Sequence, residues 1–188
     1  EIFGVNRHIR SVADGFAADG YVALAPALFD RVERGVELGY GEDGRDRGRA
    51  IRGGIAWGDA INDIAAAVAA LSGMKVGVVG YCWGGSLAWL AATRIDGIAA
   101  AVCYYGGQIK EFRDETPRCP VLMHFGSKDS SIPMDSVEAI RSAQPDIPIY
   151  VYEGAGHGFN CDERGSYDAA AAATARQRTM EMLVKTVG

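Results

Sequence analysis

The chain has 188 residues, of which 48% are hydrophobic and 23% are charged, and its net charge at pH 7 is −5. The length suits a single domain over residues 1–188, and the composition is ordinary for a soluble globular protein. The negative charge disfavours nucleic acid as a partner, and no apolar run reaches the roughly 20 residues of a membrane span.

The first third of the chain is predicted to form a helix, a strand and a long loop. Apolar residues at helical spacing indicate a helix over residues 6–19, on which His8 is expected at the surface. Residues 21–25 are expected to form a strand. Residues 29–52 are polar, glycine-rich and carry several arginines, so we expect a long surface loop. Such loops are often functional, although each arginine could equally belong to a solvated charged face.

From residue 60 onwards, predicted helices and strands alternate. We expect helices over residues 60–71, 86–93, 134–142 and 168–187, and strands over residues 76–81, 98–105, 121–125 and 148–152. The strands are apolar on both faces, which is typical of a parallel sheet covered by helices on both sides.

The stretch Gly80-Tyr81-Cys82-Trp83-Gly84 lies between a predicted strand and a predicted helix. G-x-C-x-G in this setting is the cysteine form of a nucleophile elbow. The turn is expected to be so tight that side chains at Gly80 and Gly84 would clash, while Cys82 is held in a strained conformation. The N-terminus of the next helix would favour a thiolate there. The alternative is a glycine-rich turn with a buried cysteine.

Two further polar residues follow later strands. Asp129 comes after the strand at 121–125, and His157 after the strand at 148–152. Carboxyl ends of parallel strands share one edge of the sheet, so both are expected near Cys82. A thiol needs a base, and an imidazole needs a carboxylate to fix its tautomer. The alternatives are that Asp129 is only a turn residue, or that Asp135 is the partner; His124 is expected in the core.

The other cysteines, Cys103, Cys119 and Cys161, are scattered, with no C-x-x-C and no zinc-like spacing. Single cysteines of this kind are typical of a reducing compartment, so we expect a cytoplasmic protein without a metal site. The chain begins at Glu1 without Met, inside what reads as structured sequence, and we expect further residues upstream.

Several segments resemble the dienelactone hydrolase (carboxymethylenebutenolidase) family. They are residues 1–6 (EIFGVN), 80–85 (GYCWGG), 104–106 (YYG), 126–129 (GSKD) and 154–159 (GAGHGF). The resemblance implies an α/β-hydrolase fold, with a mostly parallel sheet flanked by helices and with the family's N-terminal strands missing from this chain. It also implies that neither a metal nor an organic cofactor is needed.

The resemblance further implies a role for each site residue. Cys82 would be the nucleophile, His157 the base and Asp129 its orienting acid. Glu1 would contact the resting cysteine and help to generate the thiolate once substrate displaces it. The backbone N–H groups of Ile2 and Trp83 would form the oxyanion hole. The reaction would be attack on a lactone carbonyl, ring opening to an acyl-enzyme, and hydrolysis to a dicarboxylic keto acid such as maleylacetate.

Arginines that bind the substrate carboxylate are the point at which the chain departs from the family. The family uses two, and Arg45 is the best match for the first, with Arg47 and Arg49 as neighbours. The second is expected shortly after His157, where this chain has Asn160-Cys161-Asp162, with Arg164 nearby but out of register. The resemblance therefore leaves open a substrate other than the usual dienelactone.

Two alternatives to a lactone hydrolase remain at this stage. One is a broader carboxylesterase or thioesterase of the same fold. The other is a non-catalytic hydrolase-fold protein for binding, against which the intact Cys82, Asp129 and His157 argue. The expected partner is a small ester or lactone, with no nucleic acid and no membrane. Nothing in the sequence indicates an obligate interface, so a monomer is expected.

Overall fold

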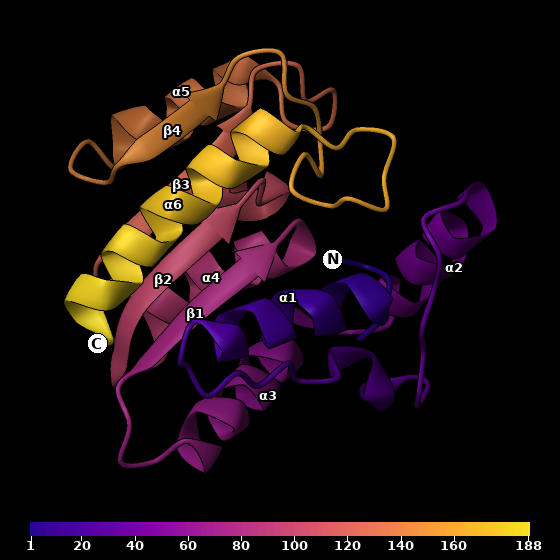
Figure 1. The fold of residues 1–188 in the computed structure, drawn as a ribbon, viewed down its shortest axis with the longest axis horizontal. Helices are drawn as coiled ribbons and strands as arrows, with labels where there is room; N and C mark the ends of the chain where they lie inside the picture. Colours follow the sequence, from indigo (N-terminus) through magenta and orange to yellow (C-terminus); the bar gives the residue numbers. More distant parts are fainter. The chain divides into compact units, whose positions relative to one another are not determined.

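The computed structural model describes residues 1–188, which divide into two compact units (Figure 1). One unit consists of Glu1 and Leu71–Gly188, and the other of Ile2–Ala70. The first unit contains the β-sheet, and the second is built from helices and connecting segments. None of the helices combines the length and the hydrophobicity that a membrane span requires.

The sheet has four parallel strands in the order β1-β2-β3-β4. They are β1 (Val76–Tyr81), β2 (Ile98–Tyr104), β3 (Val121–Gly126) and β4 (Ile149–Tyr152). Each end lies within one residue of the predicted one, and the prediction of a parallel sheet is confirmed. Because the strands are parallel, their carboxyl ends all lie at the same end of the sheet, and the segments that follow them emerge there.

Helices cover both faces of this sheet. They are α4 (Trp83–Arg94), α5 (Met134–Ala143) and α6 (Ala169–Thr186). A short 3₁₀ helix, η2 (Gly107–Phe112), lies between β2 and β3. α6 crosses one face, whereas α4 and α5 lie on the other (Figure 1). A Cβ at Gly77 of β1 would lie 2.9 Å from the Leu183 side chain, so the glycine lets α6 approach the strand closely. Asp168 caps α6 by accepting hydrogen bonds from the backbone of its first turn.

A buried polar network ties α6 to three strands. His124 of β3 is fully buried, and its Nδ1 lies 2.9 Å from the Tyr152 hydroxyl of β4. Its Nε2 lies 3.2 Å from Thr179 Oγ1, which is 2.6 Å from the Tyr104 hydroxyl of β2. Burial, assisted by the charge of Arg178, lowers the pKa of His124 to about 3, so the ring is neutral. The prediction that His124 is a core residue is confirmed.

The unit Ile2–Ala70 contains α1 (Arg7–Ala18), the 3₁₀ helix η1 (Leu28–Arg31), α2 (Glu42–Gly53) and α3 (Trp57–Ala70). α1 and α3 match the predicted helices, and Asn6 caps α1 by accepting a hydrogen bond from Ile9 N. His8 was expected at the surface, and this is wrong, because its side chain is buried. Its ring packs edge-on against Tyr40, with 6.2 Å between the ring centroids.

The strand predicted over residues 21–25 does not form. The segment belongs to none of the strands of the sheet, and Val22 and Leu24 are 64% and 46% exposed. A strand exists only where a neighbour completes its hydrogen-bond ladder, and β-favouring side chains cannot replace that neighbour. The prediction therefore failed although the residue pattern was suitable.

The long loop predicted over residues 29–52 is also wrong in part, because α2 occupies its second half. Glu42 and Asp43 in the first turn and Arg52 in the last turn complement the helix dipole. Glycines that weaken helix propensity are explained by packing: a Cβ at Gly44 would lie 2.1 Å from Gly39 O. The prediction counted the glycines as loop signals and missed the charge pattern.

Candidate active site

Cys82 joins β1 to α4 in a conformation that is rare for a residue with a side chain. Its φ is 58° and its ψ is −118°. The conformation is held from both sides, because its N–H donates to Tyr104 O at 3.0 Å and its carbonyl accepts from Gly85 N at 2.9 Å. The predicted strained elbow is thus confirmed, and neighbouring hydrogen bonds maintain the strain.

The glycines around Cys82 do not all serve the predicted purpose. A Cβ at Gly80 would lie 1.8 Å from Gly84 O, so the expected clash is confirmed there. At Gly84 a Cβ would meet only the backbone nitrogen of Glu1 at 3.6 Å, which is an ordinary contact. The second tight position is Gly85, where a Cβ would lie 2.3 Å from Tyr104 O. The elbow therefore needs Gly80 and Gly85.

Asp129 follows β3 and is buried. Its Oδ1 accepts hydrogen bonds from Ser131 N at 2.8 Å and Ile132 N at 3.1 Å. These bonds fix the orientation of the carboxylate and leave Oδ2 directed at His157 Nδ1, 2.7 Å away. Asp129 is therefore not only a turn residue, because its carboxylate both stabilises its own loop and bonds to His157.

The loop that carries His157 crosses the sheet. β4 and β1 are at opposite edges of the sheet, and three strand spacings separate them by about 14 Å. Residues 153–157 fold back over the end of β3, where Lys128 N donates to Ala155 O at 2.9 Å. A Cβ at Gly126 would lie 2.3 Å from Ala155 O, so the end of β3 must lack a side chain for the loop to pass.

The crossing brings His157 to Cys82. His157 Nε2 lies 3.0 Å from Cys82 Sγ, so Asp129, His157 and Cys82 form one chain of hydrogen bonds. Burial raises the pKa of Cys82, but the hydrogen bond and charge of His157 outweigh it and the net pKa is lowered. Burial lowers the pKa of His157, but the hydrogen bonds to Asp129 and Cys82 outweigh it and the net pKa is raised. The pair therefore favours a thiolate beside an imidazolium, which the N-terminus of α4 also supports.

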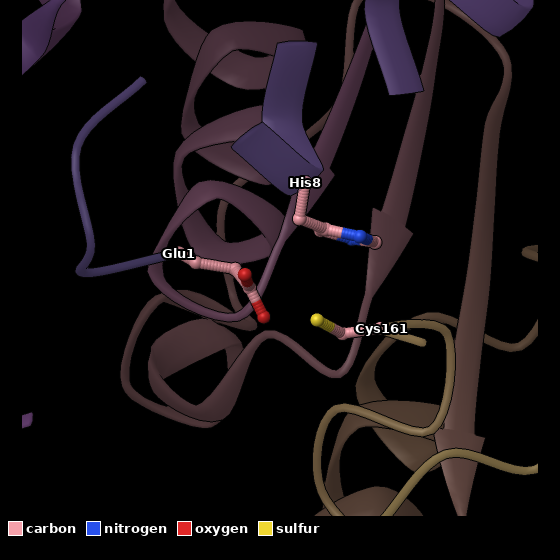
Figure 2. A group of neighbouring side chains, drawn as sticks. All are labelled: Glu1, His8 and Cys161. Atoms are coloured by element: carbon pink, nitrogen blue, oxygen red, sulfur yellow. The ribbon is translucent and has the colours of Figure 1, made fainter. Parts of the chain in front are cut away.

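Glu1 lies beside this chain of hydrogen bonds. Its backbone nitrogen donates to Tyr81 O at 2.7 Å, and its side chain is fully buried. The carboxylate accepts from Arg164 Nη1 at 3.4 Å and points toward the Cys161 thiol (Figure 2). The structure pairs Cys82 with His157 and Glu1 with Arg164, and the contact between Glu1 and the resting cysteine stays a prediction.

The remaining predicted residues are distributed between the units. Trp83 is the first residue of α4, so its backbone N–H lies at the helix N-terminus beside Cys82, as an oxyanion donor would. Ile2 and Arg45 belong to the unit Ile2–Ala70, in which Arg45 lies exposed on α2. The roles of all three stay predictions.

Sequence reasoning did not include Tyr105 in the site. It named Arg164 only as an arginine near the position of the family's second arginine. The Tyr105 ring lies edge-on to His157, with 5.2 Å between centroids. The guanidinium of Arg164 packs on Gly158, where a Cβ would lie 2.5 Å from Nη1. The available signals were the tyrosine pair at the end of a strand and the glycine after the histidine, but neither indicates where a side chain points.

The lowered pKa of Cys82 makes a direct prediction. The ultraviolet absorbance of the thiolate should appear at a pH below the value of about 8.5 that is usual for cysteine. The signal is isolated by subtracting the titration of Cys82→Ala. In His157→Asn only burial remains as the main influence, so the midpoint should move above the usual value. Equal midpoints in the wild type and His157→Asn would contradict the ion pair.

Comparisons with known proteins indicate the family of this chain. The model of the dienelactone hydrolase family matches residues 1–187. A candidate carboxymethylenebutenolidase of Synechocystis sp. is 37% identical over 202 residues, which span 97% of this chain and 82% of the relative. The carboxymethylenebutenolidase of Pseudomonas putida is 34% identical over 195 residues, with the same two shares.

The fold is also found among solved structures. A candidate dienelactone hydrolase from Klebsiella pneumoniae superimposes with a TM-score of 0.84 and 29% identity. The match covers 98% of this chain and 84% of that chain. The likeness therefore extends over nearly the whole of this chain.

Proposed function

This chain belongs to the dienelactone hydrolase family, and we propose that it uses Cys82 to open a small lactone through an acyl-enzyme. The family makes it a hydrolase of ester or lactone bonds, which decides against the non-catalytic alternative. The observation that carries the finer proposal is the chain of hydrogen bonds from Asp129 through His157 to Cys82, at 2.7 Å and 3.0 Å.

The chemistry follows from the protons in that chain. The Cys82 thiolate attacks the lactone carbonyl, and the oxyanion that forms is stabilised by the backbone N–H of Trp83 and, as predicted, of Ile2. When the tetrahedral intermediate collapses, the ring oxygen leaves and takes the proton from His157 Nε2. The product of this step is a thioester with the opened chain still attached.

Hydrolysis reverses the roles. His157 takes a proton from water as the oxygen attacks the thioester carbonyl, and the second intermediate expels the Cys82 thiolate. Asp129 keeps Nδ1 protonated and stabilises the imidazolium in both halves. Water supplies the hydroxyl group of the released acid and the proton that returns to His157. The thiolate–imidazolium pair is thereby restored, and water is the only other reactant.

The proposed substrate class is a lactone that carries a carboxylate and opens to a dicarboxylic keto acid such as maleylacetate. Two arginines support an anionic substrate. Arg164 is 21% exposed beside the buried Glu1, and Arg45 is exposed with no carboxylate of the chain paired to it. A broader carboxylesterase or thioesterase is the second candidate, because Arg164 is already engaged by Glu1.

A lactone panel tests the proposal. Carboxylate-bearing lactones, neutral lactones and p-nitrophenyl esters should be compared by kcat/KM, and the acyl-enzyme trapped by rapid acid quenching and located by mass spectrometry. We expect the carboxylate-bearing lactones to be the best substrates and the acyl group to be on Cys82. An acyl group on another residue would contradict the cysteine mechanism. A preference for neutral esters would favour a broader carboxylesterase or thioesterase.

Arg45 makes a prediction that separates the two candidates. Arg45→Gln should raise KM about tenfold for a carboxylate-bearing lactone, since a charged hydrogen bond is lost, and leave neutral esters unaffected. Arg49→Gln, an exposed arginine on the same helix that pairs with Asp46, removes the same charge and serves as the matched control. Equal effects of the two substitutions would show that only overall charge matters.

A further inference from the structure

His157 lies on a loop, so no helix or strand fixes the backbone that carries its ring. It stands between Gly156 and Gly158, and Gly158 has a φ of 76°. Glycines on both sides give this backbone more conformational freedom than other residues would. The ring is bonded at both nitrogens, to Asp129 at 2.7 Å and to Cys82 at 3.0 Å. These two bonds are maintained only if the backbone below the ring is held as well.

Ser166 bonds to this backbone from nine residues further along the chain. Its hydroxyl donates to the His157 carbonyl oxygen at 2.6 Å, which is at the short end of the usual range for a hydroxyl donor. A Cβ at Gly156 would lie 3.8 Å from Ser166 Cβ, so the serine also lies against the residue before the histidine. Ser166 therefore contacts the backbone at the point where its glycines make it least restricted.

The segment that carries Ser166 is itself held at the start of α6. Asp168, the cap of that helix, donates through its backbone N–H to Phe159 O at 3.0 Å. The Phe159 ring is fully buried and packs against Tyr105, with 5.3 Å between the ring centroids. Ser166 thus connects His157 to a helix that is packed on the sheet.

Tyr105 restricts the imidazole in a different way. It has a φ of 38°, and its ring lies edge-on to His157. Its buried hydroxyl makes no hydrogen bond, so the contact between the two rings is one of packing. Packing limits the space available to the imidazole, whereas a hydrogen bond to the adjacent carbonyl has a preferred distance and direction.

We propose that Ser166 is a positioning residue, which holds His157 Nε2 at its distance of 3.0 Å from Cys82 Sγ by bonding to the His157 carbonyl. The inference rests on the proposed function, in which this nitrogen gives up a proton and takes one back. Ser166 bonds to backbone and to none of the reacting atoms, so it acts through geometry. A displacement of about 1 Å at a reacting group can lower a rate by a factor of about 10².

Ser166→Ala should lower kcat by a factor of about 10 to 100 and leave KM unchanged. The loss should be equal for carboxylate-bearing lactones and neutral esters, because every substrate uses His157. A role confined to ordering the loop predicts another pattern. Arg164 lies on the same loop, so loosening it there would raise KM for carboxylate-bearing lactones and spare neutral esters. That pattern would overturn the inference.

Two further variants separate positioning from stability. Ser166→Thr keeps the hydroxyl and should restore kcat. Thr186→Val removes a comparable bond, from the Thr186 hydroxyl to Met182 O at 2.9 Å in the last turn of α6. Ser166→Ala and Thr186→Val each lose one bond from a hydroxyl to a carbonyl, so their melting temperatures should fall by similar amounts, while kcat falls only in Ser166→Ala. Equal kcat in these two variants would contradict the proposed role.

The thiolate titration of Cys82 tests the inference without turnover. The hydrogen bond and charge of His157 lower the pKa of Cys82. A displaced imidazole should therefore move the midpoint of Ser166→Ala upward, toward that of His157→Asn, and Thr186→Val should keep the midpoint of the wild type. Ser166→Ala removes no charge, so the shift reports the position of the imidazole. An unchanged midpoint refutes the inference alone, whereas a shifted midpoint in an enzyme that hydrolyses no lactone or ester refutes the proposed function alone.

Discussion

Replacing Cys82 with alanine is expected to abolish lactone and ester turnover, by a factor on the order of 10⁵, and to leave the fold intact. The loss is large because the sulfur would form the covalent intermediate and no other nucleophile is placed on His157 Nε2. The fold should survive because alanine keeps the Cβ, and the backbone bonds that hold the elbow do not involve the side chain. Initial rates and melting temperature, measured on the same preparation, check both halves.

Cys119→Ala is the matched control for this experiment. Cys119 is a free, partly buried cysteine that precedes β3 at the end remote from the elbow. It should retain the activity of the wild type. If Cys82→Ala also kept full activity, the cysteine mechanism would be abandoned.

Asp129→Asn is expected to lower kcat on the order of 10³- to 10⁴-fold with little change in structure. The amide oxygen can still accept from Ser131 N and Ile132 N, while the amide NH₂ faces His157 Nδ1. Two donors cannot bond to each other, so the imidazole takes the tautomer in which Nδ1 accepts and Nε2 carries its proton as a neutral ring. The thiolate loses its imidazolium, and the base is already protonated at the nitrogen that must accept.

Asp135→Asn decides between the two aspartates that the sequence offered. Asp135 lies in the first turn of α5, exposed, with its carboxylate accepting from the Ser136 hydroxyl. Its substitution should leave kcat near that of the wild type. A pH–rate profile of Asp129→Asn that matched the wild type would show that the carboxylate does not tune the imidazole.

The parallel sheet was predictable because each of its strands is a predominantly apolar run bounded by polar or glycine-containing turns. Once the strands are placed, the topology brings Cys82, Asp129 and His157 to one edge without any side-chain detail. Residue chemistry then suggests the order of the contacts, since an imidazole can bridge a thiol and a carboxylate.

The predictions that failed depend on tertiary partners. Residues 21–25 have suitable side chains for a strand but no ladder neighbour, and His8 is buried by packing that local polarity does not indicate. α2 forms despite its glycines, and at Gly44 the glycine is required by the close approach of the Gly39 backbone. The place of Tyr105 in the site was not predictable, because neither its positive φ nor its unpaired hydroxyl follows from the sequence.

The path of the loop over β3 makes the acid and the base a single cooperative unit. Ser127 Oγ accepts from Gly154 N and Lys128 N donates to Ala155 O, so the segments that carry Asp129 and His157 are bonded to each other. Cys82 belongs to a different body, the junction of β1 and α4, and meets this unit at His157. A local opening that frees one of these segments should also free the other. The site should therefore lose Asp129 and His157 together rather than one at a time.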